Sequence, residues 1–412
     1  MTVAEGGAER RGPLAGVRVL DLSARLSGPF ATMILADLGA EVVKVEPPLR
    51  GEQSRTIEPL INGHSAYFIS VNRGKHSVAI DFRPAQGREL LMKLVDASDV
   101  FVENFVPGTL AKYSLDFEPV AARNQRIIYA SISGFGQTGP DRGLPAFDII
   151  TQAMSGLLSI TGAPDGIPAR VGISIGDLSA GVYAAVGILA ALVERQSSGV
   201  GQHLDISMLE TQVALMENAF TRFFASGEQP RPLGSRHPLV TPFQAFPTAD
   251  GYVVVALRSE AQWGPFCEVL EIPEVATEAR FATNGLRTSN HGELEPILSA
   301  AIARRPTAEW IALLRARHIP SAPVQTILDV VAMPQLADRG MWVKAEQTGV
   351  GDWTFVNSPI KLSRTPAGVQ GPAPLVGDST RLVLESLCGC DSEELQDLAD
   401  RGIITLGDEP MA

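Results

Sequence analysis

A single acid, Asp177, lies between Gly176 and Gly181, directly before a long apolar, alanine-rich segment. The two glycines allow the backbone to turn sharply and to be approached closely. The β-branched residues before Asp177 are typical of a strand, and the segment Ala180–Val193 is typical of a helix. We therefore expect Asp177 at a strand-to-helix junction, at or near the helix N-cap, where free N–H groups favour an ionised carboxylate. Such a carboxylate is either a cap or a nucleophile.

The composition indicates a globular protein of more than one domain. The chain has 412 residues, of which 45% are hydrophobic and 19% charged, and a net charge of −12 that argues against a nucleic-acid partner. The polar stretch 1–11 does not resemble a secretory signal, and the helix Ala180–Val193 is shorter than the ~20 residues that span a bilayer. Cys267, Cys388 and Cys390 have neither a disulfide pattern nor zinc-binding spacing. We expect a cytoplasmic protein with no metal and no membrane partner.

Strands and helices alternate in the first half of the chain and would position Asp177. Strands are expected over 17–22, 40–46, 77–82, 99–105 and 126–133, and helices over 29–38 and 87–97. This alternation predicts a parallel, doubly wound sheet, whose ligands lie beyond the carboxyl ends of the strands. Asn104–Phe105, Ser133–Phe135 and Asp177 are all predicted at such ends. The loop 23–28 lacks the dinucleotide glycine fingerprint, so no pyrophosphate is expected against the first helix.

The second half indicates a smaller α+β domain. A hairpin is expected over 241–256, with its turn at Asp250–Gly251. Helices are expected over 211–224, 261–270, 292–304, 307–317, 379–387 and 392–401.

Motifs found in one order along the chain resemble those of the class III CoA-transferase family. This family includes formyl-CoA, carnitine and succinate–hydroxymethylglutarate CoA-transferases and α-methylacyl-CoA racemase. The matching stretches are 14–22, 28–29, 38–46, 72–77, 102–108, 133–140, 147–156 and 176–181.

The resemblance implies that Asp177 is a catalytic nucleophile. It would attack an acyl-CoA thioester to give an aspartyl–acyl anhydride; the CoA thiolate would then form an aspartyl-CoA thioester, from which the acceptor carboxylate takes CoA. No general base is needed, since an Asp of ordinary pKa, ~3.9, is ionised at neutral pH. The backbone N–H groups of Ser133–Gly134 and Gly234–Ser235 are candidate oxyanion donors. CoA is expected as a substrate, and no permanently bound cofactor is expected.

The resemblance also implies a CoA-binding site. Its candidate residues are Leu26, Ser27, Ile80, Asp81, Phe82, Arg83, Asn104, Phe105, Lys112, Ser133, Gly134, Phe135 and Gly136. Phe105 could stack on adenine, while Lys112 and Arg83 could contact phosphates. Many relatives carry an Arg soon after the second strand, where this chain has Pro47–Pro48, and Arg50 or Arg55 could replace it.

Comparison with the resembling family at other positions indicates the reaction and the class of substrate. Phe147 occupies the place of the histidine in the racemases' His–Asp proton-transfer pair, which argues against racemisation. Arg236 and His237, with Gly234, are candidate substrate-binding residues and favour a dicarboxylate such as succinate or a C4–C6 relative. Glu260 either faces the site or begins a helix. The alternatives are an intramolecular CoA shift, a racemase, a thioester hydrolase, or a non-catalytic CoA-binding protein.

The resemblance implies an α/β fold: a large Rossmann-like doubly wound parallel-sheet domain plus a smaller α+β domain, in an interlocked ring-like homodimer. The expected divisions are a CoA-binding domain over 1–200, a linker over 201–238, the small domain over 239–330, a linker over 331–358, and a C-terminal part over 359–412 that completes the large domain.

Overall fold

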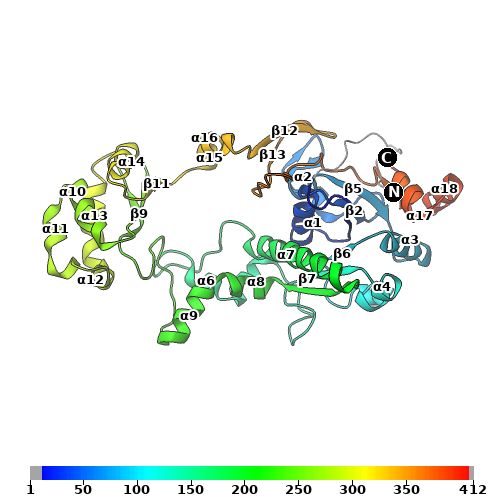
Figure 1. Cartoon of the computed structure of the whole chain (residues 1–412), viewed down its shortest axis with the longest axis horizontal. Helices are drawn as coiled ribbons and strands as arrows, with labels where there is room; N and C mark the ends of the chain where they lie inside the picture. Colours follow the sequence, from blue (N-terminus) through cyan, green and yellow to red (C-terminus); the bar gives the residue numbers. More distant parts are fainter. Residues whose placement is uncertain (1–11, 408–412) are drawn as a thin grey trace. The chain divides into compact units, whose positions relative to one another are not determined.

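The chain divides into two compact units in a computed structural model that describes residues 12–407 (Figure 1). Unit 1 comprises Met1–Leu157, Val171–Phe224 and Ala337–Ala412, and unit 2 comprises Leu158–Arg170 and Ala225–Leu336. The polar stretch 1–11, for which no secretory signal was expected, lies outside the described residues.

Unit 1 is built on a seven-stranded sheet. In sheet order its strands are β14 (Ile404–Thr405), β5 (Lys75–Ile80), β2 (Glu41–Glu46), β1 (Arg18–Asp21), β6 (Val100–Glu103), β7 (Ile128–Ser133) and β8 (His203–Ser207). All neighbouring strands are parallel except β14, which is antiparallel to β5. The order reverses at β1, between β2 and β6, and such switch points bind ligands in doubly wound folds. The predicted α/β fold with a largely parallel sheet is confirmed.

Helices and short strands surround this sheet within unit 1. They are α1 (Ser27–Asp37), η1 (Gln53–Thr56), β3 (Leu60–Ile61), β4 (His64–Ser65), α2 (Ala66–Asn72), α3 (Ala85–Asp96), η2 (Leu110–Tyr113), α4 (Phe117–Arg123), α5 (Asp148–Met154), α7 (Ile175–Ser198), α8 (Met208–Leu215), β12 (Trp342–Gln347), β13 (Gly351–Val356), α17 (Thr380–Cys388) and α18 (Ser392–Asp400). The helices α6 (Leu157–Ile160), α9 (Glu217–Ser226) and α16 (Pro334–Asp338) contain boundaries between the units.

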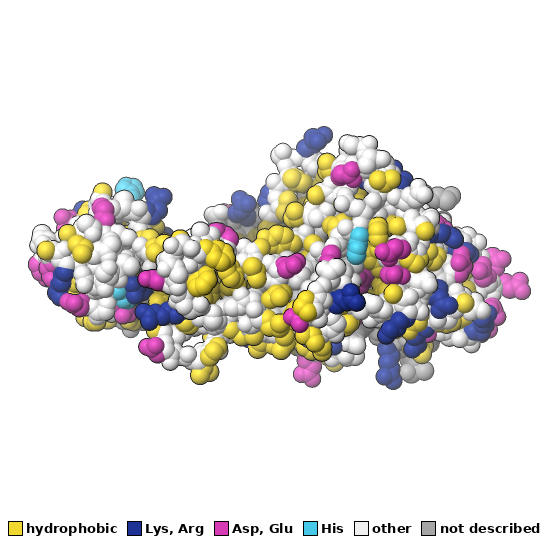
Figure 2. Space-filling model, turned by 90° about the horizontal axis from the view of Figure 1, so that it is seen from below, with side chains coloured by type: hydrophobic (Ala, Val, Ile, Leu, Met, Phe, Trp, Pro, Cys, Tyr) yellow, Lys and Arg dark blue, Asp and Glu magenta, His cyan; other side chains and the backbone are white. Residues whose placement is uncertain are grey.

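Helix α7 is longer than predicted. It has 24 residues and, by length and composition alone, could cross a membrane, so the expectation of a helix too short for this is wrong. A core helix passes the same test, and the side of α7 that carries Ala180, Ala184 and Ile188 is buried. Val186 and Val193 are exposed. Hydrophobic side chains are spread over much of the face shown in Figure 2.

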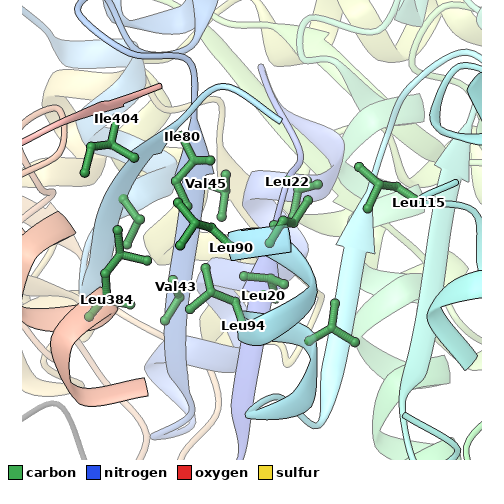
Figure 3. Packing of buried hydrophobic residues seen from close by; sticks show 14 of the residues in the cluster. Leu20, Leu22, Val43, Val45, Ile80, Leu90, Leu94, Leu115, Leu384 and Ile404 are labelled. Carbon is green, nitrogen blue, oxygen red and sulfur yellow. The ribbon is translucent and has the colours of Figure 1, made fainter. Parts of the chain in front are cut away.

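The sheet separates two hydrophobic cores. The central strands β2, β6 and β7 are buried along their whole length, so that even Lys44 of β2 and Ser131 of β7 are buried. On one face, Leu20, Val43 and Ile80 pack with Leu90 of α3 and Leu384 of α17 (Figure 3). On the other, the next residues along the strands pack against α1 and α7, because successive side chains point to opposite faces.

Unit 2 contains a three-stranded antiparallel sheet in the order β11-β10-β9. The predicted hairpin is confirmed as β9 (Phe243–Pro247) and β10 (Tyr252–Ala256), with β11 (Ser321–Pro323) beside it. The helices are η3 (Glu260–Gln262), α10 (Trp263–Val269), α11 (Pro273–Thr277), η4 (Ala279–Phe281), α12 (Asn284–Ser289), α13 (His291–Ile302), α14 (Thr307–Ala316) and α15 (Ile327–Val331).

Two predicted elements are wrong. Asp177 does not follow a strand, because the described residues between β7 and α7 contain none. There Val171 N donates to the side-chain Oε1 of Gln152 (3.0 Å), and Ile175 N donates to Ile173 O. The helix expected over 211–224 is interrupted at Met216, where α8 ends and α9 follows.

Candidate active site

Asp177 is the third residue of α7, and Ser174 is the N-cap. Helix α7 lies in the connection between β7 and β8, which are parallel neighbours. A helix that connects parallel strands begins near the carboxyl end of the first strand. Asp177 thus reaches the carboxyl edge of the sheet at the N-terminus of a helix and not at the end of a strand.

The backbone before Asp177 is held by buried polar side chains. Gly176 N donates to Asp148 Oδ1 (2.8 Å), and Gln152 Nε2 donates to Asp148 Oδ2 (2.7 Å). A Cβ atom on Gly176 would lie 2.5 Å from Gln212 Nε2, so a larger residue would displace this network. Glycine is required here because of this close approach, as the sequence suggested.

Ser27, at the start of α1, forms a side-chain hydrogen bond with Asp177. Helices α1 and α7 approach closely at Gly181, where a Cβ atom would lie 2.8 Å from Ser27 O. At the end of β6, Asn104 Nδ2 donates to Ala24 O (2.8 Å) and to Ser27 Oγ (3.3 Å). These contacts fix the loop that follows β1 at the switch point of the sheet, beside Asp177.

The charge state of Asp177 differs from the sequence expectation. Burial, together with the neighbouring Asp148 carboxylate, raises the pKa of Asp177 to about 6, although the Ser27 hydrogen bond and the Arg25 charge act in the opposite direction. The expectation of an ordinary pKa is therefore wrong. The carboxyl group is still about nine-tenths ionised at pH 7.

Two further residues belong to this environment. Burial raises the pKa of Tyr67 to about 12, with the charges of Asp177 and Glu52 acting in the same direction, so its phenol stays protonated at neutral pH. Arg25 interacts electrostatically with both Asp177 and Tyr67. Sequence reasoning missed Arg25 and Tyr67, because tertiary structure alone brings them to Asp177.

The predicted CoA-binding residues follow four strands at the carboxyl edge of the sheet. Leu26 and Ser27 follow β1, Asn104 and Phe105 follow β6, and Ser133 is the last residue of β7, immediately before Gly134, Phe135 and Gly136. Ile80 ends β5, immediately before Asp81, Phe82 and Arg83. The structure thus brings these segments to one edge of the sheet.

An aromatic cluster lies among them. The ring of Phe82 is edge-on to that of Phe105, with centroids 6.3 Å apart, and to that of Tyr113, with centroids 5.5 Å apart. Lys112 is exposed and precedes Tyr113 in η2. A cation next to partly buried rings suits a ligand that joins an aromatic base to phosphates.

Other candidates are engaged within the protein. Ile80 is only 1% exposed and packs in the core, so its side chain is not available to a ligand. Arg83 donates to both carboxylate oxygens of Asp81 (2.8 Å each). Arg55 likewise donates to both oxygens of Glu46 (2.8 and 2.6 Å), so the hypothesis that Arg55 replaces the missing phosphate contact is wrong.

One of the proposed backbone donors and one candidate CoA-binding residue have protein partners at their backbone N–H groups. Gly136 N, in the candidate CoA-binding segment, donates to Ser133 Oγ (2.9 Å). Gly234 N donates to Gly162 O (2.8 Å) within unit 2, which contradicts its predicted role as a free oxyanion donor.

The predicted substrate-binding residues Arg236 and His237 also belong to unit 2. Arg236 Nη2 donates to Thr288 O (3.0 Å), and burial lowers the pKa of Arg236. Among the described residues, Arg236 Nε is buried without a hydrogen-bond partner. His237 Nδ1 accepts from Leu239 N (3.1 Å), and its ring packs against Phe243 with centroids 5.1 Å apart.

Glu260 has a structural position in unit 2. It accepts hydrogen bonds from Asn284 N (2.6 Å), at the start of α12, and from the buried Arg287 (2.7 Å). Of the two sequence interpretations, the helix-start acid is supported: Glu260 begins η3, directly before α10, and its side chain also contacts the start of α12. In residues 12–407, no group of three or more His, Cys, Asp or Glu side chains could hold a metal ion.

Comparison with known proteins identifies the class of this site. The model of CoA-transferase family III matches residues 14–380. The chain is 38% identical over 393 residues to the succinyl-CoA:glutarate CoA-transferase of Mus musculus, covering 95% of this chain and 90% of the relative. It is 38% identical over 357 residues to the acetyl-CoA:oxalate CoA-transferase of Acetobacter aceti, covering 86% and 90%. The crystal structure of a CaiB/BaiF family protein from Brucella suis superimposes with a TM-score of 0.83 at 36% identity, covering 92% of this chain and 100% of that one.

The chain therefore belongs to CoA-transferase family III, and it is an enzyme of the CoA-transferase class. The family resemblance seen in the sequence motifs is confirmed.

Proposed function

We propose that this enzyme transfers CoA from an acyl-CoA thioester to a free dicarboxylic acid, with Asp177 as the covalent nucleophile. The observation that carries the proposal is the Asp177 carboxylate itself, held beside Ser27 at the carboxyl edge of the sheet. Relatives named for glutarate, oxalate and mesaconate support a dicarboxylate acceptor.

The proposed reaction is a series of acyl exchanges in which no proton moves. An Asp177 oxygen attacks the thioester carbonyl, the C–S bond breaks, and CoA leaves as a thiolate, which gives a mixed anhydride. The thiolate attacks the aspartyl carbonyl, releases the donor acid as a carboxylate, and forms an aspartyl-CoA thioester. The acceptor carboxylate attacks this thioester and displaces the thiolate. The thiolate then attacks the acceptor acyl group, which forms the new acyl-CoA and regenerates Asp177.

This chemistry needs an ionised carboxylate at the site and no general base. The nucleophile must be ionised and shielded from water, because water would hydrolyse the anhydride. Partial burial supplies the shielding and also raises the pKa of Asp177. The Ser27 hydrogen bond and the Arg25 charge limit that rise, so the nucleophile remains ionised at neutral pH.

The first half-reaction should report this pKa. We expect kcat/KM for the acyl-CoA donor to rise with pH around a midpoint near 6, because only the carboxylate attacks the thioester and the pKa of Asp177 is raised to about 6. Initial rates at low donor concentration, from about pH 4.5 to about pH 8, would measure it. A midpoint near the ordinary aspartate value of 3.8 would contradict the raised pKa.

We further propose that the enzyme is a homodimer, in the interlocked arrangement that the family resemblance implies. Exposed apolar side chains on unit 1 support this proposal, because a second copy of the chain would bury them. They include Ile149, Ile150 and Met154 of α5 and Val182, Val186 and Val193 of α7. Light scattering coupled to gel filtration is expected to give twice the mass of the 43.9 kDa chain. A monomeric mass would contradict the proposal.

The transfer itself is tested by trapping the intermediates. The enzyme would be incubated with succinyl-CoA, quenched with hydroxylamine, and analysed by intact-mass and peptide mass spectrometry. We expect an aspartyl hydroxamate confined to Asp177, and in a parallel assay a new acyl-CoA formed with glutarate. Hydrolysis of succinyl-CoA without transfer to any acid would instead support a thioesterase, and an unlabelled Asp177 would contradict the covalent mechanism.

A further inference from the structure

Arg25 lies on the loop between β1 and α1, two residues before Ser27. Its backbone has φ of 67°, in the left-handed region that a non-glycine residue rarely adopts. Arg25 N donates to Glu52 Oε2 (3.3 Å), and the buried Glu52 also accepts from Ser54 N (2.8 Å). The unusual backbone conformation is thus supported by a carboxylate that η1 holds in place. Such local strain, supported by its surroundings, is concentrated at functional sites.

The Arg25 side chain is exposed and has polar and aromatic neighbours. Its Nη2 donates to Gln53 Oε1 (2.5 Å), and its Cζ lies 5.6 Å from the centroid of the Phe147 ring. Within residues 12–407, no carboxylate lies within ion-pair distance of this guanidinium. By contrast, Arg55, Arg73 and Arg83 all form direct ion pairs. Arg25 therefore retains donors for a ligand anion.

Two sets of contacts place Arg25 beside the nucleophile. Ser27, the first residue of α1 after this loop, forms a hydrogen bond with Asp177. Phe147, which lies near the guanidinium, is followed by Asp148, whose side chain holds the backbone directly before Asp177. The charge of Arg25 favours the ionised form of Asp177.

The charge of the site changes during the proposed reaction. In the free enzyme, the Asp177 carboxylate balances part of the Arg25 charge. Both the anhydride and the aspartyl-CoA thioester consume that carboxylate, so Arg25 no longer faces a negative charge at Asp177 in either intermediate. An acceptor acid must approach as an anion at this stage, and a guanidinium binds carboxylates through paired N–H donors.

We propose that Arg25 is the residue that binds the carboxylate of the incoming acceptor acid once Asp177 has been acylated. This inference rests on the proposed covalent mechanism and names the anion site of the second half-reaction. It separates donor from acceptor: the donor meets a site in which the Asp177 charge still offsets part of the Arg25 charge, whereas the acceptor meets the guanidinium after the Asp177 charge has been lost.

The test compares Arg25→Gln and Arg25→Lys with a matched control, Arg123→Gln, which removes a surface guanidinium paired with Asp96. Succinyl-CoA is the donor and glutarate the acceptor. For Arg25→Gln we expect KM for glutarate to rise at least ~10-fold, as for loss of a charged hydrogen bond, while KM for succinyl-CoA changes less than about threefold. Arg25→Lys should recover part of the loss, since the charge remains but the paired donors do not. Arg123→Gln should match the unaltered enzyme.

A second readout uses the titration of Asp177. The groups around it are Asp148 of α5, Ser27 and Arg25 of the β1–α1 loop and α1, and Tyr67 of α2. Loss of the Arg25 charge should move the pH midpoint of kcat/KM for succinyl-CoA upward, because Arg25 favours the carboxylate. If Arg25 had only a structural role, its substitution would not move this pH midpoint upward.

The outcomes separate the inference from the mechanism on which it rests. If Asp177 is labelled and transfer occurs, but Arg25→Gln raises KM for donor and acceptor equally or raises neither, the inference is overturned and the mechanism stands. If Asp177 is not labelled in the unaltered enzyme, the mechanism itself fails.

Discussion

Substitution of Asp177 by asparagine is expected to lower the rate of CoA transfer by roughly 10⁴–10⁶-fold, as for other covalent nucleophiles. The amide cannot form an anhydride, while its shape allows the Ser27 hydrogen bond to persist. The hydroxamate trapped by hydroxylamine should disappear at the same time. Asp96→Asn, which neutralises a surface carboxylate paired with Arg123, is the matched control and should retain full activity. Near-normal transfer by Asp177→Asn would rule out the proposed nucleophile.

The same variant should be folded and, at neutral pH, more stable than the unaltered enzyme. The pKa of Asp177 is about 6 in the folded protein and about 3.8 in a model peptide, so the folded state binds this proton more tightly. The resulting stabilisation is complete below about pH 4 and is lost as the pH rises through about 6. Asn mimics the protonated acid, so we expect a gain of about 1–3 kcal/mol at pH 7–8 after allowance for partial exposure. Thermal unfolding of the variant and the unaltered enzyme at neutral pH measures this gain in stability. Equal stability of the two proteins would argue against the raised pKa of Asp177.

Substitution of Lys75 by methionine is expected to destabilise unit 1 by about 3–5 kcal/mol, because it leaves a buried carboxylate without its ion pair. Lys75 Nζ lies 3.0 Å from Asp21 Oδ2, and both side chains are fully buried. It also donates to Pro29 O (3.0 Å) and to Asn72 Oδ1 (2.9 Å). Burial lowers the pKa of Lys75 to about 8, whereas Lys75 and Lys44 keep the pKa of Asp21 below its usual range in spite of its burial.

A double-variant cycle tests this buried pair. Asp21→Asn combined with Lys75→Met removes both charges, so the loss should be smaller than the sum of the two single losses by at least about 1 kcal/mol. The surface pair provides the comparison: Asp96→Asn should cost less than about 1 kcal/mol. Urea unfolding would give the differences. A Lys75→Met loss no larger than that of Asp96→Asn would show that the buried pair is not important for stability.

The sequence predicted the sheet best where burial is complete. Strands β2, β5, β6 and β7 all contain β-branched residues and are largely buried, because both faces of the sheet are covered. Strand β8 was missed because polar residues alternate along it and it lies at an edge of the sheet. The strand predicted before Asp177 has suitable residues but no neighbouring strand, and pairing with a neighbour is what local sequence cannot show.

The residues of the site could be predicted from the sequence where they match a family motif. Asp177, Ser27 and Asn104 were all identified from family motifs, and the structure brings them together. Arg25 and Tyr67 were not identified, because neither belongs to a motif and only the folding of the β1–α1 loop and α2 brings them to Asp177. The Arg55 hypothesis failed for the opposite reason: a cation at a suitable position in the sequence is bound to Glu46 in the fold.

The pairing of Ile404 in β14 with Ile80 in β5 has a consequence for synthesis of the chain. Until β14 has been synthesised and released from the ribosome, β5 has an unpaired hydrogen-bonding edge, and such edges can pair with other chains. Nascent unit 1 therefore cannot complete its sheet before β14 emerges, and chains that terminate before β14 should be prone to aggregation.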